Sequence, residues 1–282
     1  MNQAADSDGP PSARVQSPLT GQVIVLTGAS EGIGKALALE LSRRGVCLVL
    51  AARNRQRLEE VANQCAAQGS VAIVVPTDLL DPAQCRALID AAVARFGRID
   101  VLINNAGGTM WARFDALDDL SAYEHLMKLN YLGAVHVTAA ALPWLKQARG
   151  RLVAVASVAG LTGVPERSGY AASKHAMVGF FDSLRIELAG SGLTVTIIAP
   201  GFVRSEIHKR AIGPDGRPLG ESPMRVERIM SAEECARLIV PAIERRRRLL
   251  ITSLRGRLAR WLKLILPGVV DRMAARAIRE RH

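Results

Sequence analysis

The residues best placed to do chemistry are a tyrosine and a lysine four positions apart, Tyr170 and Lys174, with Ser157 thirteen positions before the tyrosine. On a helix, residues with this spacing share one face, so the ammonium of Lys174 would lie near the phenol of Tyr170. A nearby positive charge favours a phenolate, and a phenol tuned in this way is a usable general acid and base. The spacing also fits an unrelated surface pair. Its position after Ser157 and a predicted strand favours the catalytic interpretation.

A second candidate site is the glycine-rich turn T-G-A-S-E-G-I-G at 27–34, which follows an apolar run and opens a segment with helical spacing. Glycines allow a tight turn and a close backbone approach, so amide groups and a helix N-terminus can meet a pyrophosphate. The strand before the turn and the helix after it favour dinucleotide binding over a turn without a ligand. The candidate contacts in the turn are Gly28, Ser30, Glu31, Gly32, Ile33 and Gly34.

The end of the second predicted strand indicates which dinucleotide is preferred. A carboxylate there would bind the ribose 2′-hydroxyl and repel a 2′-phosphate. The segment A-A-R-N at 51–54 has no carboxylate, and Arg53 offers a fork of donors suited to phosphate. We therefore predict NADP(H) rather than NAD(H). Two observations limit this inference, because Glu31 could lie near the same phosphate and Arg53 could be a solvated arginine at a strand end.

The elements that must position these residues alternate along the chain. Apolar runs predict strands at 23–26, 46–51, 71–75, 99–103, 152–156, 193–198 and 249–252, and helical spacing predicts helices at 35–44, 55–68, 82–96, 122–144 and 169–188. Near-continuous apolar strands separated by helices predict a parallel sheet covered on both faces. We expect an α/β, doubly wound Rossmann fold with three layers in one domain at 21–255, preceded by a loose polar tail at 1–20.

In combination, these motifs resemble the short-chain dehydrogenase/reductase family. They are the glycine turn, N-N-A-G at 104–107, Ser157, Y-x-x-x-K at 170–174 and P-G at 200–201, and they occur in order from about residue 20 to 205. The resemblance implies an oxidoreductase that moves a hydride between nicotinamide and a carbonyl or secondary alcohol carbon. It implies that Ser157 bonds the substrate oxygen, that Tyr170 passes the proton, and that Lys174 also holds the nicotinamide ribose.

The resemblance assigns further roles. Asn130 would complete a catalytic tetrad by supporting a water-mediated proton relay. Ser205 stands where family members commonly carry threonine, and it keeps the hydroxyl. The additional cofactor contacts implied are Asp78, Leu79, Asn105, Ala106, Gly107, Pro200, Gly201, Val203 and Ser205. The resemblance also implies a homodimer or homotetramer.

Substrate identity depends on the segment 201–225, where prolines and glycines exclude a long helix. Its position after a strand places it over the carboxyl edge of the sheet, so we expect a mobile substrate lid, the alternative being an ordinary surface excursion. Apolar side chains near the site predict a hydrophobic ketone or secondary alcohol, such as a lipid or steroid. They are Met110, Trp111, Phe114, Val164, Phe202 and Ile207.

The basic charge is concentrated at the C-terminus. Residues 244–282 hold twelve lysines and arginines and three acidic residues, a net charge of +9 out of +11 for the chain. Within the predicted basic, amphipathic helices at 256–282, one helical face collects Leu258, Trp261, Leu262, Ile265 and Leu266. This pattern suits an anionic membrane surface, and it also suits packing on the body of the protein or on a second subunit. Nucleic-acid binding through 245–248 is disfavoured because no groove-reading pattern accompanies these arginines.

Composition narrows the class of protein. Apolar residues at 49% and charged residues at 22% exclude a disordered chain. The first twenty residues lack the apolar stretch of a signal peptide, and scattered cysteines without zinc-ligand spacing predict no metal and a reducing compartment. We expect a cytoplasmic protein, peripheral at the membrane if the C-terminus docks there. The alternative to an enzyme is a membrane-docked, dinucleotide-binding regulatory protein, which the complete set of Ser157, Tyr170 and Lys174 disfavours.

Overall fold

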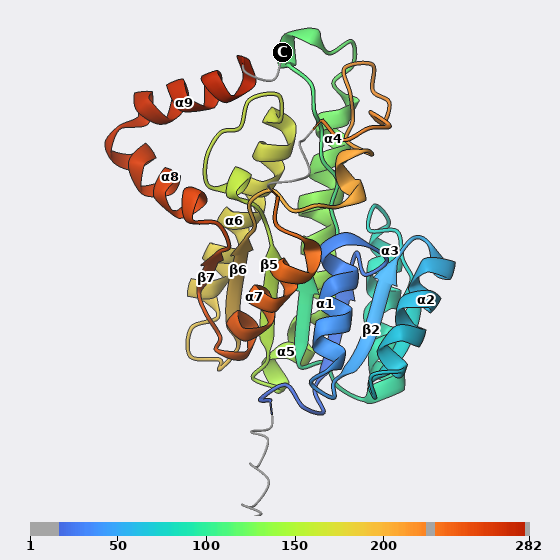
Figure 1. Ribbon diagram of the computed structural model, residues 1–282. Coiled ribbons are helices and arrows are strands. Elements are labelled where there is room, and N and C mark those ends of the chain that lie inside the picture. The colour runs from blue at the N-terminus through green and yellow to red at the C-terminus, as the bar shows by residue number, and fades with distance from the viewer. Residues whose placement is uncertain (1–16, 224–228, 280–282) are drawn as a thin grey trace, which may run out of the picture.

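The computed structural model describes residues 17–223 and 229–279. In this part of the chain, seven parallel strands form one sheet in the order β3-β2-β1-β4-β5-β6-β7 (Figure 1). The strands are β1 (Val23–Thr27), β2 (Cys47–Ala52), β3 (Val71–Pro76), β4 (Val101–Asn104), β5 (Arg151–Val155), β6 (Thr194–Ala199) and β7 (Leu249–Ile251). The strand order reverses between β1 and β4, as in a doubly wound sheet, which confirms the predicted fold class.

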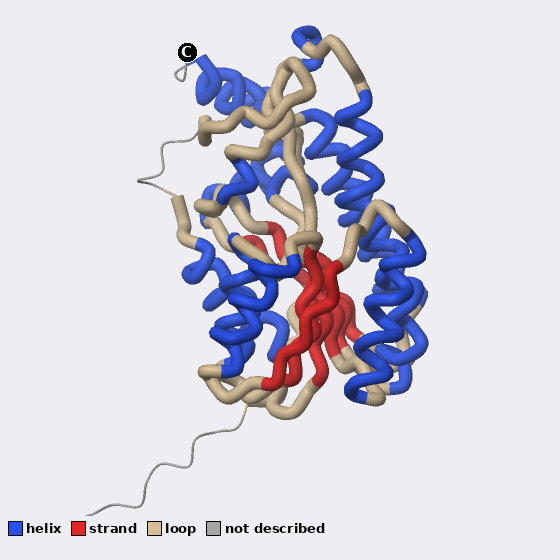
Figure 2. The backbone as a smooth tube through the Cα atoms, turned by 90° about the vertical axis from the view of Figure 1, so that its right-hand side faces the viewer, coloured by secondary structure: helices blue, strands red, loops and turns tan. Residues whose placement is uncertain are grey.

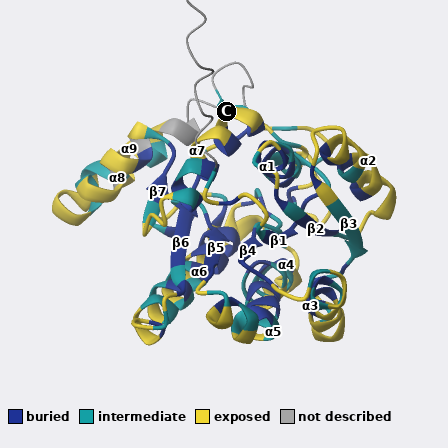
Figure 3. Ribbon diagram, turned by 90° about the horizontal axis from the view of Figure 1, so that it is seen from below, coloured by how far each residue is buried: buried dark blue, intermediate teal, exposed yellow. Residues whose placement is uncertain are grey.

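Helices cover both faces of the sheet (Figure 3). Those packed on one face are α1 (Gly32–Ser42), α2 (Arg55–Ala66) and α7 (Ala232–Glu244), and those on the other are α3 (Pro82–Phe96), α5 (Gly133–Gln147) and α6 (Ser168–Glu187). Alternation along each strand supplies both cores. In β1, for example, Ile24 and Leu26 enter the core under α1, whereas Val23 and Val25 enter the opposite one.

The helix α7 is absent from the elements expected from the sequence, although its start carries a clear signal. The hydroxyl of Ser231 accepts a hydrogen bond from the Glu234 N–H at 3.1 Å, and the Glu234 carboxylate accepts one from the Ser231 N–H at 2.8 Å. This reciprocal pair is a capping box, which the sequence S-x-x-E already indicates. The buried face of α7 then packs against α1.

The single helix expected at 122–144 is more complex in the structure. It runs as α4 (Ser121–Leu126), a π-helical segment (Met127–Leu132) and α5 without a break. In the π-helical segment the Gly133 N–H donates to the carbonyl of Lys128, five residues back, so that one turn holds an extra residue.

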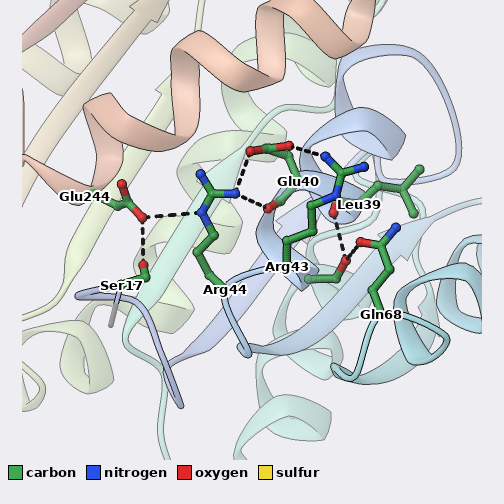
Figure 4. A network of polar contacts seen from close by, with 8 residues as sticks. Ser17, Leu39, Glu40, Arg43, Arg44, Gln68 and Glu244 are labelled. Atoms are coloured by element: carbon green, nitrogen blue, oxygen red, sulfur yellow. Dashed lines mark hydrogen bonds and ion pairs between the residues drawn. The ribbon is translucent and has the colours of Figure 1, made fainter. Parts of the chain in front are cut away.

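The start of the domain lies earlier than expected. The sequence predicts a loose tail that includes residues 17–20, but Leu19 is fully buried, and the Ser17 hydroxyl donates to the Glu244 carboxylate of α7 at 2.7 Å. Glu244 also pairs with Arg44, which bonds Glu40 at 2.6 Å (Figure 4). This network joins the entry of the chain to α1 and α7. The rest of the expected tail, 1–16, lies outside the described residues.

The chain ends in two further helices, α8 (Leu254–Ile265) and α9 (Pro267–Arg279), which project from the side of the sandwich as a bent arm (Figures 1 and 2). Before the arm, Arg246 has a positive φ of 51° and is used structurally. Its guanidinium donates to the backbone carbonyls of Arg149, Gly150 and Gly192 and to the hydroxyl of Thr194. In the described ranges, no helix is both long enough and apolar enough to cross a membrane.

Candidate active site

The carboxyl ends of β1 to β6 surround a cavity of about 740 Å³. Every predicted cofactor contact lines this cavity, from Gly28 in the glycine turn to Ser205 after β6, and so do Ser157, Tyr170 and Lys174. A crevice at this edge, where the strand order reverses, is the place where doubly wound sheets bind ligands. Of the four predicted catalytic residues, Asn130 is missing from the lining, because it is fully buried behind the wall.

The glycine turn at the start of α1 forms a cradle. Gly28 has a φ of +67°, and a Cβ on it would lie 2.7 Å from the Cα of Ala106. A Cβ on Gly34 would overlap the carbonyl oxygen of Gly28. The residue before α1, Glu31, makes no capping bond to the helix, so the first-turn N–H groups stay available to a ligand. This arrangement fits the pyrophosphate of a dinucleotide.

The side chain of Asn105 holds the turn in place. Its Nδ2 donates to the carbonyls of Thr27 and Gly28 at 3.0 and 3.2 Å. The Thr27 hydroxyl in turn accepts from the N–H groups of Asn105 and Ala106. The segment after β4 is therefore fastened to the end of β1, which places Asn105, Ala106 and Gly107 beside the cradle.

Three arginines lie at the end of the cavity beside β2. Arg53 is exposed there, as expected, and Arg57 and Arg210 line the same region without having been predicted. Arg57 donates to the Glu31 carboxylate at 2.9 Å, and Arg210 forms a second ion pair with the same carboxylate. The charge of Glu31 is thus opposed by two arginines. The sequence carries a signal for the position of Arg57. Asn54 is a favourable N-cap that marks the start of α2, and Arg57, three residues later, lies in the first turn of that helix.

Asp78 and Leu79 follow β3 at the same end of the cavity. The Asp78 N–H donates to Gln84 at 2.8 Å, and the Asp78 carboxylate accepts from the Leu80 N–H at 3.0 Å. Leu79 packs so closely on the start of α5 that a Cβ on Gly133 would lie 2.9 Å from the Leu79 Cβ. These bonds hold the loop in the position where an adenine contact is expected.

Lys174 lies beside Tyr170, and its Nζ is 5.9 Å from the centre of the phenol ring. The Nζ donates to the carbonyl of Val155 at 3.0 Å and lies 3.3 Å from the sulfur of Met177. Burial lowers the pKa of Lys174 to about 7. The amine therefore changes its charge near neutral pH. Lys174 alone does not keep a constant positive charge beside the phenol.

Arg167 is an unpredicted residue that supplies such a charge. Its guanidinium lies 4.4 Å from the centre of the Tyr170 ring, 5.3 Å from that of Trp111 and 5.6 Å from that of Phe202. It is buried, and it donates to the Thr109 hydroxyl at 2.6 Å. Because arginine stays protonated in proteins, this cation persists at all physiological pH values and is attracted to the ring faces.

Asn130 occupies the π-helical segment and makes structural bonds. Its Oδ1 accepts from the Gly108 N–H at 2.7 Å, and its Nδ2 donates to the Gly108 carbonyl at 3.1 Å and to the Ser173 hydroxyl at 2.8 Å. A Cβ on Gly107 would lie 2.9 Å from Asn130 Oδ1 and 3.4 Å from Lys174 Nζ, so these residues are neighbours. The side chain fixes the segment beside Lys174, while the expected role in a water relay stays a prediction.

The apolar wall differs in part from the expected one. Phe202 and Ile207 line the cavity as predicted, but Met110 and Val164 pack behind Tyr170, and Phe114 is 64% exposed. Trp111 stacks on Phe202 with ring centres 6.4 Å apart instead of lining the cavity itself. The further lining residues on this side are Leu126, Leu129, His208 and Ile212. His208 is buried, which lowers its pKa, and it bonds the Val203 carbonyl.

The sequence and the structure both match known proteins. Over 260 residues the chain is 36% identical to 11-beta-hydroxysteroid dehydrogenase 1A of Arabidopsis thaliana, which covers 90% of this chain and 74% of that protein. It is 40% identical over 235 residues to human dehydrogenase/reductase SDR family member 7, which covers 80% of this chain and 68% of the relative.

Two solved structures of oxidoreductases superpose on this chain over most of its length. A short-chain dehydrogenase/reductase of Burkholderia phymatum in complex with NAD superposes with a TM-score of 0.78 at 27% identity, covering 89% of this chain and 95% of the other. An alcohol dehydrogenase of Thermococcus sibiricus complexed with 5-hydroxy-NADP gives a TM-score of 0.72 at 26% identity, covering 82% and 95%. The family model described as short chain dehydrogenase matches residues 22–213. The chain thus belongs to the short-chain dehydrogenase/reductase family, whose oxidoreductases act on CH–OH groups with a nicotinamide dinucleotide.

Proposed function

We propose that this oxidoreductase uses NADP(H) to interconvert a secondary alcohol and a ketone on a hydrophobic, steroid-like substrate. One observation carries the proposal. A single cavity holds the glycine cradle and its arginines at one end and Ser157, Tyr170 and Lys174 at the other, with apolar side chains beside them. The chain can therefore hold a dinucleotide and an apolar substrate together.

The arginines beside β2 support the choice of NADP(H). A 2′-phosphate carries negative charge and is bound at the end of the second strand in this fold. Arg53 and Arg57 are hydrogen-bond donors at that end of β2. Glu31 would repel the phosphate if it stood alone, but Arg57 and Arg210 already pair with it. The local balance of three arginines against the two carboxylates of Glu31 and Asp78 favours the phosphorylated dinucleotide.

When bound, the nicotinamide supplies or accepts the hydride. The protein contributes positioning and proton transfer. The Ser157 hydroxyl donates a hydrogen bond to the substrate oxygen, and the Tyr170 phenol gives a proton to that oxygen during reduction or takes it during oxidation. Arg167 keeps a positive charge beside the phenol ring and Lys174 places an amine donor near it, and burial of both excludes water from that side of the site.

The apolar wall supports a hydrophobic substrate. Leu126, Leu129 and Phe202 line the side of the cavity near Tyr170. Several of the similar plant proteins are named as 11-beta-hydroxysteroid dehydrogenases. A fused-ring, steroid-like alcohol matches such a wall because it offers a broad apolar surface and a single polar handle.

The test is cofactor titration followed by turnover. We expect the purified chain to bind NADPH more tightly than NADH, and to oxidise NADPH in the presence of apolar ketones. Tyr170→Phe should lower kcat by about 10²- to 10⁴-fold, the usual contribution of a general acid, and leave NADPH affinity nearly unchanged. Tyr131→Phe is the matched control, because Tyr131 packs on Phe180 and does not line the cavity. Equal turnover in wild type and Tyr170→Phe would refute the proposed chemistry, and tighter NADH binding would refute the cofactor.

A further inference from the structure

The arm formed by α8 and α9 turns an unexpected side toward the body. Gly256 is buried at the start of α8, and a Cβ there would lie 2.8 Å from Val158 Cγ2 and from Ser253 Oγ. Lys263 lies two turns further on the same side, with its Nζ 3.8 Å from the position of a Cβ on Gly163. The inner side of α8 therefore carries a glycine and a lysine instead of an apolar stripe.

The apolar stripe of α8 lies on the opposite side of the helix. At about 100° per residue, Leu254, Leu258, Trp261 and Ile265 share one face that is about 180° from Gly256. Their exposed fractions are 79%, 65%, 65% and 73%. An amphipathic helix of a globular protein normally turns its apolar face to the core. The inverted orientation means that this face covers something outside the described part of the chain.

Positive charge lies beside the stripe. Arg257 lies on one flank of α8, Arg260 is exposed nearer the side of Gly256, and Arg272 and Arg276 are exposed on α9. The exposed Met273 adds apolar surface on the second helix. A partner must therefore offer both an apolar medium for leucine, isoleucine and tryptophan and negative charge at its border, which is the chemistry of an anionic lipid bilayer.

We propose that the outer face of α8 and α9, defined by Leu254, Leu258, Trp261, Ile265 and Met273 with their flanking arginines, is a docking surface for anionic lipid membranes. It holds the protein at the bilayer surface without a span. The inference does not depend on the proposed reaction.

Two other occupants fit the surface less well. A second copy would bring two strongly basic arms together, and like charges facing each other across an interface are unfavourable. Nucleic acid would satisfy the arginines, but a phosphate backbone offers no apolar medium for the four side chains of the stripe. The bilayer satisfies both components at once.

The test is flotation of the full chain with phosphatidylcholine vesicles that contain or lack phosphatidylserine. We expect binding to the phosphatidylserine vesicles, a blue shift of Trp261 emission, and weaker binding as salt is raised. Leu258→Glu, Trp261→Glu and Ile265→Glu should each reduce binding at least tenfold. Ile186→Glu is the matched control, because Ile186 on α6 is 72% exposed and distant from the arm, and it should bind as the wild type does.

Other outcomes overturn the proposal. Binding that Ile186→Glu reduces as much as Trp261→Glu would mean that no particular face docks. If the wild type fails to float and Trp261→Glu halves its molar mass in sedimentation, the face is an interface between copies. If the chain binds duplex DNA in preference to vesicles, and Arg260→Gln but not Trp261→Glu abolishes that binding, the arm is a nucleic-acid surface. The thermal unfolding midpoint, measured in parallel, shows that each variant is folded.

Discussion

Glu31 is an acidic side chain at the place where a 2′-phosphate is expected, and its two arginine partners determine its effect. The carboxylate is 26% exposed and is contacted by Arg57 and Arg210. It can therefore orient Arg57 toward the cavity while its own charge is compensated. A residue that looks unfavourable for NADP(H) when the sequence is considered alone becomes part of a basic cluster in the structure.

We expect Arg57→Ala to weaken NADPH binding by about 10- to 100-fold, the equivalent of one charge-assisted hydrogen bond, and to change NADH binding little. Glu31→Gln should strengthen NADPH binding, because it removes the negative charge of the carboxylate and keeps the shape of the side chain. Fluorescence titration with both cofactors measures the effect. Arg55→Ala is the control, since Arg55 is exposed and pairs with Glu59 on α2. Equal losses for NADPH and NADH would contradict this role of Arg57.

Lys174 gives the stability of the cofactor-free protein a defined pH dependence. Burial lowers its pKa from 10.5 to about 7, so between these values the unfolded chain holds a proton that the folded chain lacks. Stability therefore rises with pH across this window, and the cost of burying the charge is greatest below pH 7. We expect Lys174→Met to raise the thermal unfolding midpoint most at low pH, with a gain that shrinks as pH rises toward 10.5.

Thermal unfolding from pH 6 to pH 10 without cofactor measures this gain. Lys128→Met is the control, because Lys128 is an exposed lysine of the π-helical segment and its replacement removes no buried charge. A gain for Lys174→Met that stays constant with pH would show that the amine does not titrate in this window.

At the scale of elements, the segment 201–223 bridges two parts of the site. Its middle is fastened by hydrogen bonds between Ile212 and the backbone of Thr109 and Trp111. Arg210 reaches across to Glu31 in the glycine turn. The expected lid would thus be tethered to the element that holds the cofactor, and binding of the cofactor would affect the lid through this ion pair.

We expect Arg210→Gln to loosen this tether. A partly exposed ion pair contributes about 0.2 to 1 kcal/mol, so hydrogen exchange and protease cleavage within 206–220 should accelerate by about 1.4- to 5-fold. Arg217→Gln, an exposed arginine of the same segment, is the control and should have no effect. Equal acceleration in both variants would mean that the Glu31 contact does not restrain the segment.

The sequence predicts the strands and most helices because each contains its own apolar pattern, and it predicts the glycine cradle because the turn chemistry is local. Even α7 carried a capping box that could have been recognised. Arg167 lies three residues before Tyr170, at the N-cap of α6, so its place beside the phenol follows from local spacing. Arg210 is different, since it reaches Glu31 from a segment with no motif, and only tertiary packing brings the two together. The burial of Asn130 likewise follows from a π-helical segment that regular periodicity does not indicate.

At the scale of the whole molecule, the arm formed by α8 and α9 lies outside both cores of the sheet. The two cores lie between the sheet and helices α1 to α7, and the described residues of α8 and α9 contribute to neither core. We expect a chain ending at Ser253 to fold and to bind NADPH within about twofold of the full chain, because the arginines proposed to bind the phosphate lie before α8. Loss of NADPH binding in this shortened chain, measured by titration, would show that the arm supports the fold.

The π-helical segment makes the length of one helix a functional quantity. Deleting a single residue from 127–132 would allow a regular α-helix, because the turn that now holds the extra residue would close, and the residues inside that turn would change position. The amide of Asn130 would then swing away from Gly108 and Ser173, and the floor beneath Lys174 would be lost. A regular helix and the present position of Asn130 therefore exclude each other. We expect a variant with a deletion in this segment to gain helix stability and to lose catalytic activity.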